Sequence, residues 1–125
     1  MEKLKFINRQ MAAAKVPYEF GQWSSAVTYP YFVGEISESP AYTEDGQEQS
    51  TMILTGFHRG NFSDLLAVME QLKSLFNPVH GLRGTTNNGS AIVVFFDGYF
   101  IVPSGEAELK KIQINLKIYE WKGAI

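Results

Sequence analysis

The first regular pattern along the chain has the period of an α-helix. From about Lys3 to Ala14, apolar residues recur at three- and four-residue steps, at Leu4, Ile7 and Met11, which places them on one helix face. The alanines at the end of this stretch add helix propensity. Pro17 ends the pattern, because the residue before a proline is disfavoured in helical geometry. The sequence therefore predicts an N-terminal helix that packs on a sheet.

A second and clearer helix is predicted from Phe62 to Phe76. Asn61 is placed to cap its first turn, and Asp64 follows three residues on, where an acidic side chain favours the start of a helix. Pro78 ends the pattern. The residues at helical spacing predict a buried stripe, which consists of Leu65, Met69, Leu72 and Phe76 and is broadened by Leu66, Val68 and Leu75.

Strand patterns occupy the stretch between the two helices. Tyr29–Ile36 starts after its proline, where a missing N–H does no harm, and reads as a strand. Thr51–His58 has the β-branched and aromatic content of another strand. Val16–Tyr18 could form a further, short strand.

The C-terminal third of the chain is predicted to be entirely β. Two apolar runs, 93–96 and 99–102, flank Asp97-Gly98, a dipeptide that suits a two-residue hairpin turn. The last strand, Glu108–Trp121, alternates between two faces, as expected for a sheet with one face packed on helices and one polar face. Its apolar face consists of Ile112, Ile114, Leu116 and Ile118, and its polar face of Lys111, Gln113, Asn115 and Lys117.

Together these elements predict one α+β domain over residues 1–125. The expected order is helix, two strands, helix, three strands. The economical arrangement is an antiparallel or mixed sheet of about four to five strands with two helices packed on one face. Two long polar stretches without apolar periodicity predict flexible loops at about residues 37–50 and 80–90.

Composition narrows the classes of function. The chain of 125 residues has no cysteine, which excludes disulfides and thiolate metal sites and fits a reducing compartment. The formal net charge is −2, and Lys110-Lys111 is the only adjacent basic pair, so general nucleic-acid affinity is not expected. Neither a signal peptide nor a membrane-spanning run is recognisable. The protein is therefore expected to be made and kept in the cytosol.

No pattern of residues indicates catalysis. His58 and His80 are far apart, and a metal site needs three or four ligands at characteristic spacing. The acidic residues near Glu44–Glu48 lie in a polar stretch that offers no burial to perturb a pKa. The glycine-rich segments 81–84 and 87–90 lack the spacing of a phosphate-binding loop. We therefore assign no catalytic, metal or cofactor-binding residue and expect a protein that is not an enzyme.

Aromatic residues are the more informative feature. They reach 14% of the chain, and several lie where a core does not obviously absorb them. Tyr119 and Trp121 fall on the otherwise polar face of the last strand. Such side chains concentrate in protein–protein contacts, because they bury much area at low entropic cost. Two interpretations remain open, an interface role and a cover over the edge of a small core.

The order of these features resembles the tail terminator (tail completion) proteins of long-tailed bacteriophages. The resemblance covers nearly the whole chain: an N-terminal helix, a short strand with Val16-Pro17-Tyr18-Glu19, the proline-led strand Tyr29–Val33, a variable loop, a strand leading into the helix 62–76, a hairpin and a long final strand. It implies a small subunit without catalysis or cofactor. Such subunits close into a ring, expected to be a hexamer, at the head-proximal end of the tail tube, in the neck of the virion.

The resemblance also implies partners and contact residues. The ring would stop tube polymerisation, bind the tail tube protein and present a docking surface to the head connector, while DNA passes through its lumen. The candidate contacts with other subunits or the tube are Glu44, Asp45, Glu48, Arg83, Asn87, Asn88, Tyr119 and Trp121, and the candidate lumen-facing residues are Arg83, Lys110 and Lys111. The alternatives are another neck, head-closure or minor tail component, and a small protein-binding module of a bacterial host.

Overall fold

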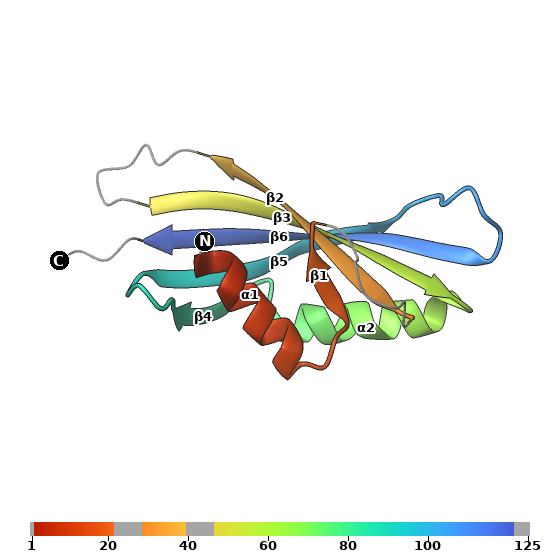
Figure 1. Ribbon diagram of the computed structural model, residues 1–125, viewed down its shortest axis with the longest axis horizontal. Helices are drawn as coiled ribbons and strands as arrows, with labels where there is room; N and C mark the ends of the chain where they lie inside the picture. Colours follow the sequence, from red (N-terminus) through yellow and green to blue (C-terminus); the bar gives the residue numbers. More distant parts are fainter. Residues whose placement is uncertain (1, 22–28, 40–46, 122–125) are drawn as a thin grey trace.

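The computed structural model shows an α+β fold in which a curled sheet surrounds one side of two helices (Figure 1). It describes residues 2–21, 29–39 and 47–121. The elements are, in chain order, α1 (Glu2–Ala13), β1 (Tyr18–Phe20), β2 (Tyr31–Ser39), β3 (Gln47–Arg59), α2 (Phe62–Leu75), β4 (Leu82–Thr85), β5 (Ala91–Ile101) and β6 (Leu109–Trp121).

Both helices form where the sequence predicts them. The side chain of Asn61 caps α2 by accepting a hydrogen bond from the backbone N–H of Asp64, which satisfies one of the free donors of the first turn. Leu65, Met69 and Leu72 are buried along α2. In α1, Ile7 and Met11 are buried as predicted, together with Phe6 and Lys3.

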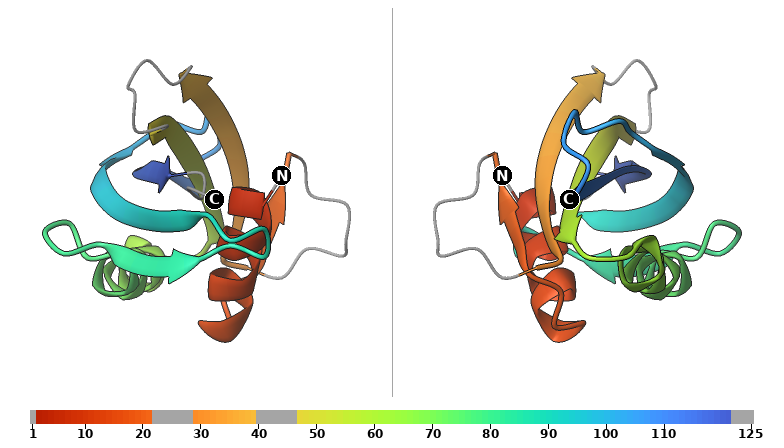
Figure 2. Two further views of the ribbon diagram at one scale, coloured as in Figure 1. Left: turned by 90° about the vertical axis from the view of Figure 1, so that its left-hand side faces the viewer. Right: turned by 90° about the vertical axis from the view of Figure 1, so that its right-hand side faces the viewer.

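The sheet has six strands in the order β1-β2-β3-β6-β5-β4, so the expected number of four to five was too low. It is mixed, because β1 runs parallel to β2 while every other pair is antiparallel. The sheet curls into a half-barrel, and the two helices lie on its concave side (Figure 2). The core fills this concave side.

Three local predictions were wrong. Asp97-Gly98 does not form a hairpin turn, because β5 continues through it with a register shift between Phe96 and Tyr99. β4 forms at Leu82–Thr85, inside a stretch predicted to be a loop. Residues 37–39 and 47–50 of the predicted loop belong to strands, since β2 extends to Ser39 and β3 begins at Gln47, and residues 40–46 lie outside the described residues. In each case, backbone pairing with a long neighbouring strand outweighs the weak local preference of these residues for a turn or loop.

Candidate functional site

Three aromatic rings gather on the convex face of the sheet near the end of β6. Phe95 on β5 meets Tyr119 edge-to-face with 5.8 Å between ring centroids, and Tyr119 stacks on Trp121 at 6.5 Å. All three side chains are partly exposed. We call Phe95, Tyr119 and Trp121 the aromatic patch. Alternation along the last strand predicted that Tyr119 and Trp121 lie on its polar face. No pattern in the sequence predicted that Phe95 lies beside them.

Strand pairing brings Arg83 next to the aromatic patch. Arg83 lies opposite Val93 on β5, and Val93 lies opposite Tyr119 on β6, so the three side chains share one row on the convex face. Arg83 is exposed. Arginine, tyrosine and tryptophan are enriched at the centre of protein–protein interfaces, and here an exposed arginine lies near partly exposed Tyr and Trp rings.

The other predicted contact residues have different surroundings. Asn87 is exposed in the turn between β4 and β5, and the Asn88 side chain is tied into that turn by Thr86 and by the backbone N–H of Ser90. Glu44 and Asp45 lie outside the described residues. Glu48 is on the concave side of the sheet, away from the aromatic patch, and pairs with β6 at Glu120.

A buried lysine, which sequence reasoning missed, organises the acidic residues at this end. The Lys3 side chain is only 3% exposed, and its Nζ lies 2.9 Å from Glu38 Oε1 and 3.8 Å from Glu48 Oε2. It also donates a hydrogen bond of 2.9 Å to Ser50 Oγ. A buried ammonium needs such partners. The available signal was its spacing, because Lys3, Ile7 and Met11 recur every four residues on one helix face.

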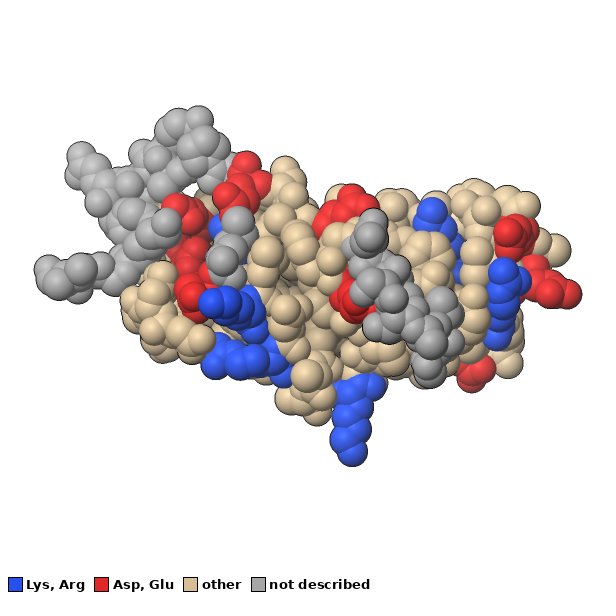
Figure 3. All heavy atoms as spheres, in the orientation of Figure 1, with Lys and Arg blue, Asp and Glu red and all other residues tan. Residues whose placement is uncertain are grey.

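Lys110 and Lys111 lie at the far end of β6 from Arg83. Eight residues separate Lys111 from Tyr119, which at strand rise is about 26 Å. The Lys111 Nζ lies 5.6 Å from the centre of the Phe57 ring, and the Lys110 Nζ lies 5.3 Å from that of Phe62. The structure thus separates the three residues predicted to face a lumen into two places. On the face seen in Figure 3, acidic and basic side chains are interspersed.

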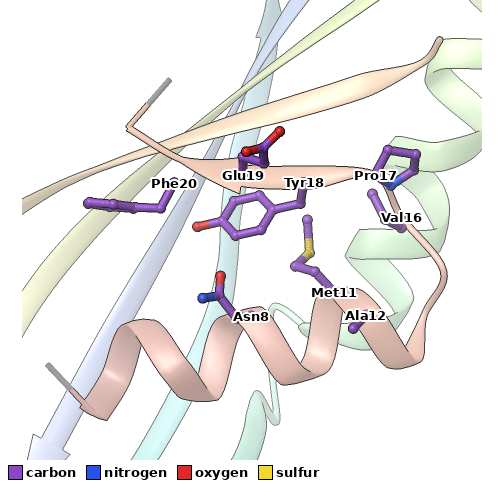
Figure 4. A pocket seen from close by; sticks show the side chains of 8 residues that line it. All are labelled: Asn8, Met11, Ala12, Val16, Pro17, Tyr18, Glu19 and Phe20. Atoms are coloured by element: carbon purple, nitrogen blue, oxygen red, sulfur yellow. The ribbon is translucent and has the colours of Figure 1, made fainter. Parts of the chain in front are cut away.

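Two hollows lie beside strand edges. The first, of about 510 Å³, is between α1 and β1 (Figure 4), and Tyr18, Asn8 and Met11 contribute to its wall. Burial raises the pKa of the Tyr18 hydroxyl to about 12, since desolvation disfavours the phenolate. The second hollow, of about 560 Å³, lies where the end of α2 meets β5, and Lys73 and Asp97 are its charged residues.

Among the described residues, the longest run of exposed large apolar side chains is on β5. Tyr99, Phe100 and Ile101 are 45%, 50% and 52% exposed. Three consecutive side chains on a strand cover both of its faces, so this segment is apolar on either side. The sequence predicted a strand here but gave no sign that it would protrude beyond the core.

His58 on β3 contacts an acidic side chain of α2. His58 is buried, with its Nε2 3.3 Å from Asp64 Oδ2, and no described residue is a hydrogen-bond partner of its Nδ1. Among residues 2–21, 29–39 and 47–121, no group of three or more His, Asp or Glu is placed to hold a metal ion. None of the helices within these residues is long and apolar enough to span a membrane.

Comparison with known proteins adds no relative. No family model matches the chain, and no curated protein matches it.

Proposed function

We propose that this protein is a structural subunit of the phage tail terminator type. In this proposal, several copies close into a ring, expected to be a hexamer, that caps the head-proximal end of the tail tube, ends tube polymerisation and presents a docking surface to the head connector. The subunit is made in the host cytoplasm and ends in the neck of the virion. DNA passes through the lumen, and no catalysis is involved.

The observation that carries the proposal is the exposed run Tyr99–Ile101 on β5. A strand that presents large apolar side chains and a free backbone edge to water is a template for association with another chain. Such a segment is a liability in a permanent monomer and is expected in a subunit that assembles. The element order on which the family resemblance rests, with a helix, a short strand and a proline-led strand at the start, is consistent with it.

A ring that caps a tube needs a second surface for a different partner. The aromatic patch and Arg83 lie on the convex face near the end of β6, whereas Tyr99–Ile101 pairs with the first half of that strand. The two surfaces are therefore far enough apart to be used at once. We assign contact with the tube protein to the aromatic patch and Arg83, and contact between subunits to β5.

The proposal is tested by native mass spectrometry of the protein alone and mixed with the tube protein of the same phage, together with electron microscopy of growing tubes. A closed ring, or a complex that sits at tube ends and halts their growth, is the expected result. Trp121→Ala should weaken tube capping at least tenfold while leaving ring formation intact.

Asn115→Ala is the matched control, since Asn115 is on the same face of β6 but outside the aromatic patch. It should cap tubes as the unmodified protein does. A strict monomer that ignores the tube at high concentration contradicts the proposal, and the interpretation as a protein-binding module of a bacterial host then replaces it.

A further inference from the structure

β4 is the last strand on one side of the sheet, and no described strand lies beyond it. The backbone N–H of Thr86 donates a hydrogen bond to the carbonyl of Ser90, toward β5. Because the backbone groups of a strand point alternately to its two sides, those of Arg83 and Thr85 point away from β5. No hydrogen bond joins them to another described segment. The outer edge of β4 therefore offers two N–H groups and two carbonyls to a partner.

Two arginines flank this edge on opposite faces of the sheet. Arg83 is exposed on the convex face. On the concave side α1 lies beside β4 (Figure 1), and its Phe6 ring packs so closely on Gly84 that a Cβ there would lie 2.5 Å from it. The Arg9 guanidinium carbon lies 5.8 Å from the centre of that ring. No described carboxylate forms an ion pair with either arginine, so both charges are available to a partner.

The edges on the other side of the sheet have the opposite charge. β1 has only β2 beside it, and β2 beyond Gly34 has only β3. This end of β2 carries Glu35 and Glu38, of which Glu38 forms an ion pair with Lys3, and β1 carries Glu19. Like charges directly opposite each other destabilise a strand pair, so these edges are not suited to an acidic partner.

β5 beyond Val94 is a fourth edge, with β6 alone beside it. Phe96 at its start is already bonded, because its N–H donates to the carbonyl of Phe76 over 2.8 Å. The part that follows is the apolar run Tyr99–Ile101, which we assign to the contact between subunits. Among the described strands, β4 is therefore the edge whose flanking charges favour an acidic strand.

We propose that an extended, acidic segment of the tube protein adds as a strand to the outer edge of β4. Its backbone bonds to Arg83 and Thr85, and its carboxylates bind Arg83 and Arg9. The inference rests on the proposed function and specifies its tube contact. In such strand addition, main-chain hydrogen bonds give affinity and side chains give specificity. The same charges prevent β4 from pairing with β4 of another copy, since charged side chains on an edge repel their like.

The added strand continues the surface that is assigned to the tube. Tyr119, Val93 and Arg83 form one row on the convex face, so the next position in that row belongs to the incoming segment. A carboxylate there reaches Arg83, whose planar guanidinium binds a carboxylate through two parallel hydrogen bonds. The aromatic patch and the edge of β4 then form one continuous contact.

A proline at position 85 tests the backbone contact. Thr85→Pro removes an N–H that points away from β5, and edge strands tolerate proline where the N–H faces solvent, so circular dichroism should show a folded domain. Tube capping, followed by electron microscopy of growing tubes, should be at least about tenfold weaker than with Thr85→Val, which keeps the N–H. Equal capping by the two variants would overturn the inference, because main-chain bonding at β4 would then contribute nothing.

Charge reversal provides a second readout. Arg83→Glu and Arg9→Glu should each weaken tube capping about tenfold, while native mass spectrometry shows an unchanged ring. Lys15→Glu, just beyond the end of α1, makes the same change of charge away from β4 and is the control, which should cap tubes as the unmodified protein does. Loss of the ring rather than of capping in the two arginine variants would make a second copy the occupant of this edge and contradict the proposal.

A synthetic peptide tests the edge without the tube. A short peptide of alternating Glu and Val is titrated into isotope-labelled protein and followed by NMR, with a peptide of alternating Lys and Val as the control. We expect saturable shifts of the amide signals of Arg83 and Thr85 with the acidic peptide only, and binding about tenfold weaker in Arg83→Glu. Shifts confined to the other edges, or none with the acidic peptide, would contradict an acidic-strand site at β4.

The outcomes separate the inference from the proposed function. A protein that caps tubes equally well as Thr85→Pro and Thr85→Val, and that ignores the acidic peptide, overturns the inference and leaves the proposed function standing. A protein that binds the acidic peptide at β4 but never caps tubes supports the edge as an acidic-strand site. It contradicts the proposed function, and with it the tube as the source of the strand.

Discussion

At the scale of single residues, Tyr18 shows how the short strand β1 is held. Its hydroxyl lies 3.8 Å from the Met52 sulfur, and its ring lies over Gly34, where a Cβ would approach the hydroxyl to 2.6 Å. Only glycine leaves room for the ring at that position. The hydroxyl is thereby removed from water, which raises its pKa to about 12.

This burial predicts a specific dependence of stability on pH. The phenol of the unfolded chain ionises near pH 10 and that of the folded chain near 12. The stabilisation from keeping Tyr18 neutral is therefore complete below pH 10 and is lost as pH rises through 12. Tyr18→Phe removes this contribution, so the variant should lose less stability than the unmodified protein between pH 10 and 12, by about 1 kcal/mol after allowance for partial exposure.

The measurement is urea unfolding at several pH values in this range. Tyr99→Phe is the matched control, because this ring is half exposed to water, and it should follow the unmodified protein. Parallel curves for Tyr18→Phe and the unmodified protein would mean that the Tyr18 hydroxyl is no better shielded in the folded chain than in the unfolded one.

At the scale of elements, the sequence predicted those whose period is long and consistent. α2 repeats its apolar residues over twelve positions, from Leu65 to Phe76, and β6 over seven, from Ile112 to Ile118. Both elements form within one residue of the expected ends. β4 was missed because its four residues include Gly84 and Arg83 and have no period of their own. It forms only because β5 offers a partner, which is a long-range cause that local patterns do not contain.

β5 was divided by the prediction because Asp97-Gly98 supports a turn and a β-bulge equally well. Gly98 has a positive φ of 115°, which side chains disfavour, and β5 continues past it with shifted register. The positive φ expected at the Asp97-Gly98 dipeptide is present at Gly98, whereas the hairpin turn predicted there does not form, because β5 stays paired with β6 beyond it. The long β6 pairs with β5 on both sides of the bulge and so keeps the strand continuous.

Gly98→Ala is predicted to destabilise the fold by about 1 kcal/mol. Nothing lies within 4 Å of a Cβ at this position, so the cost comes from backbone strain at positive φ, partly offset by the lower entropy of the unfolded chain. The thermal midpoint should fall by about 4 °C, as measured by circular dichroism. Asp97→Ala, at the same bulge, is the control and should change stability by less than about 0.5 kcal/mol, since it removes only an exposed ion pair. Equal effects of the two variants would contradict the strain argument.

At the scale of the whole molecule, the curl of the sheet decides which residues meet. Alternation along β6 was enough to place Tyr119 and Trp121 on the polar face, but the position of Arg83 beside them follows from the β4–β5–β6 register. Lys3 meets Glu38 and Glu48 only because α1 begins over the same corner of the sheet. Charge, composition and periodicity do not specify such long-range pairings. The neighbours of Arg83 and Lys3 could therefore not be predicted from the sequence.

The exposed β5 edge links self-association to stability. If folded copies associate and unfolded ones do not, the thermal midpoint rises with protein concentration. A hundredfold increase in protein concentration raises the free energy of unfolding by up to about 2.7 kcal/mol per contact. For a chain of this length, that predicts a rise in the thermal midpoint of roughly 5 °C or more. Differential scanning calorimetry over that range measures it.

Two variants assign the effect to the edge rather than to unspecific aggregation. Phe100→Lys replaces a half-exposed ring with a charge that an apolar contact does not accept, so its midpoint should not depend on concentration, and it should equal that of the unmodified protein at high dilution. Trp121→Ala, in the aromatic patch, should keep the full dependence, because that surface is assigned to the tube. A midpoint of the unmodified protein that stays constant over the whole range would show that the exposed edge does not hold subunits together, and the apolar run on β5 would then need a partner other than this chain.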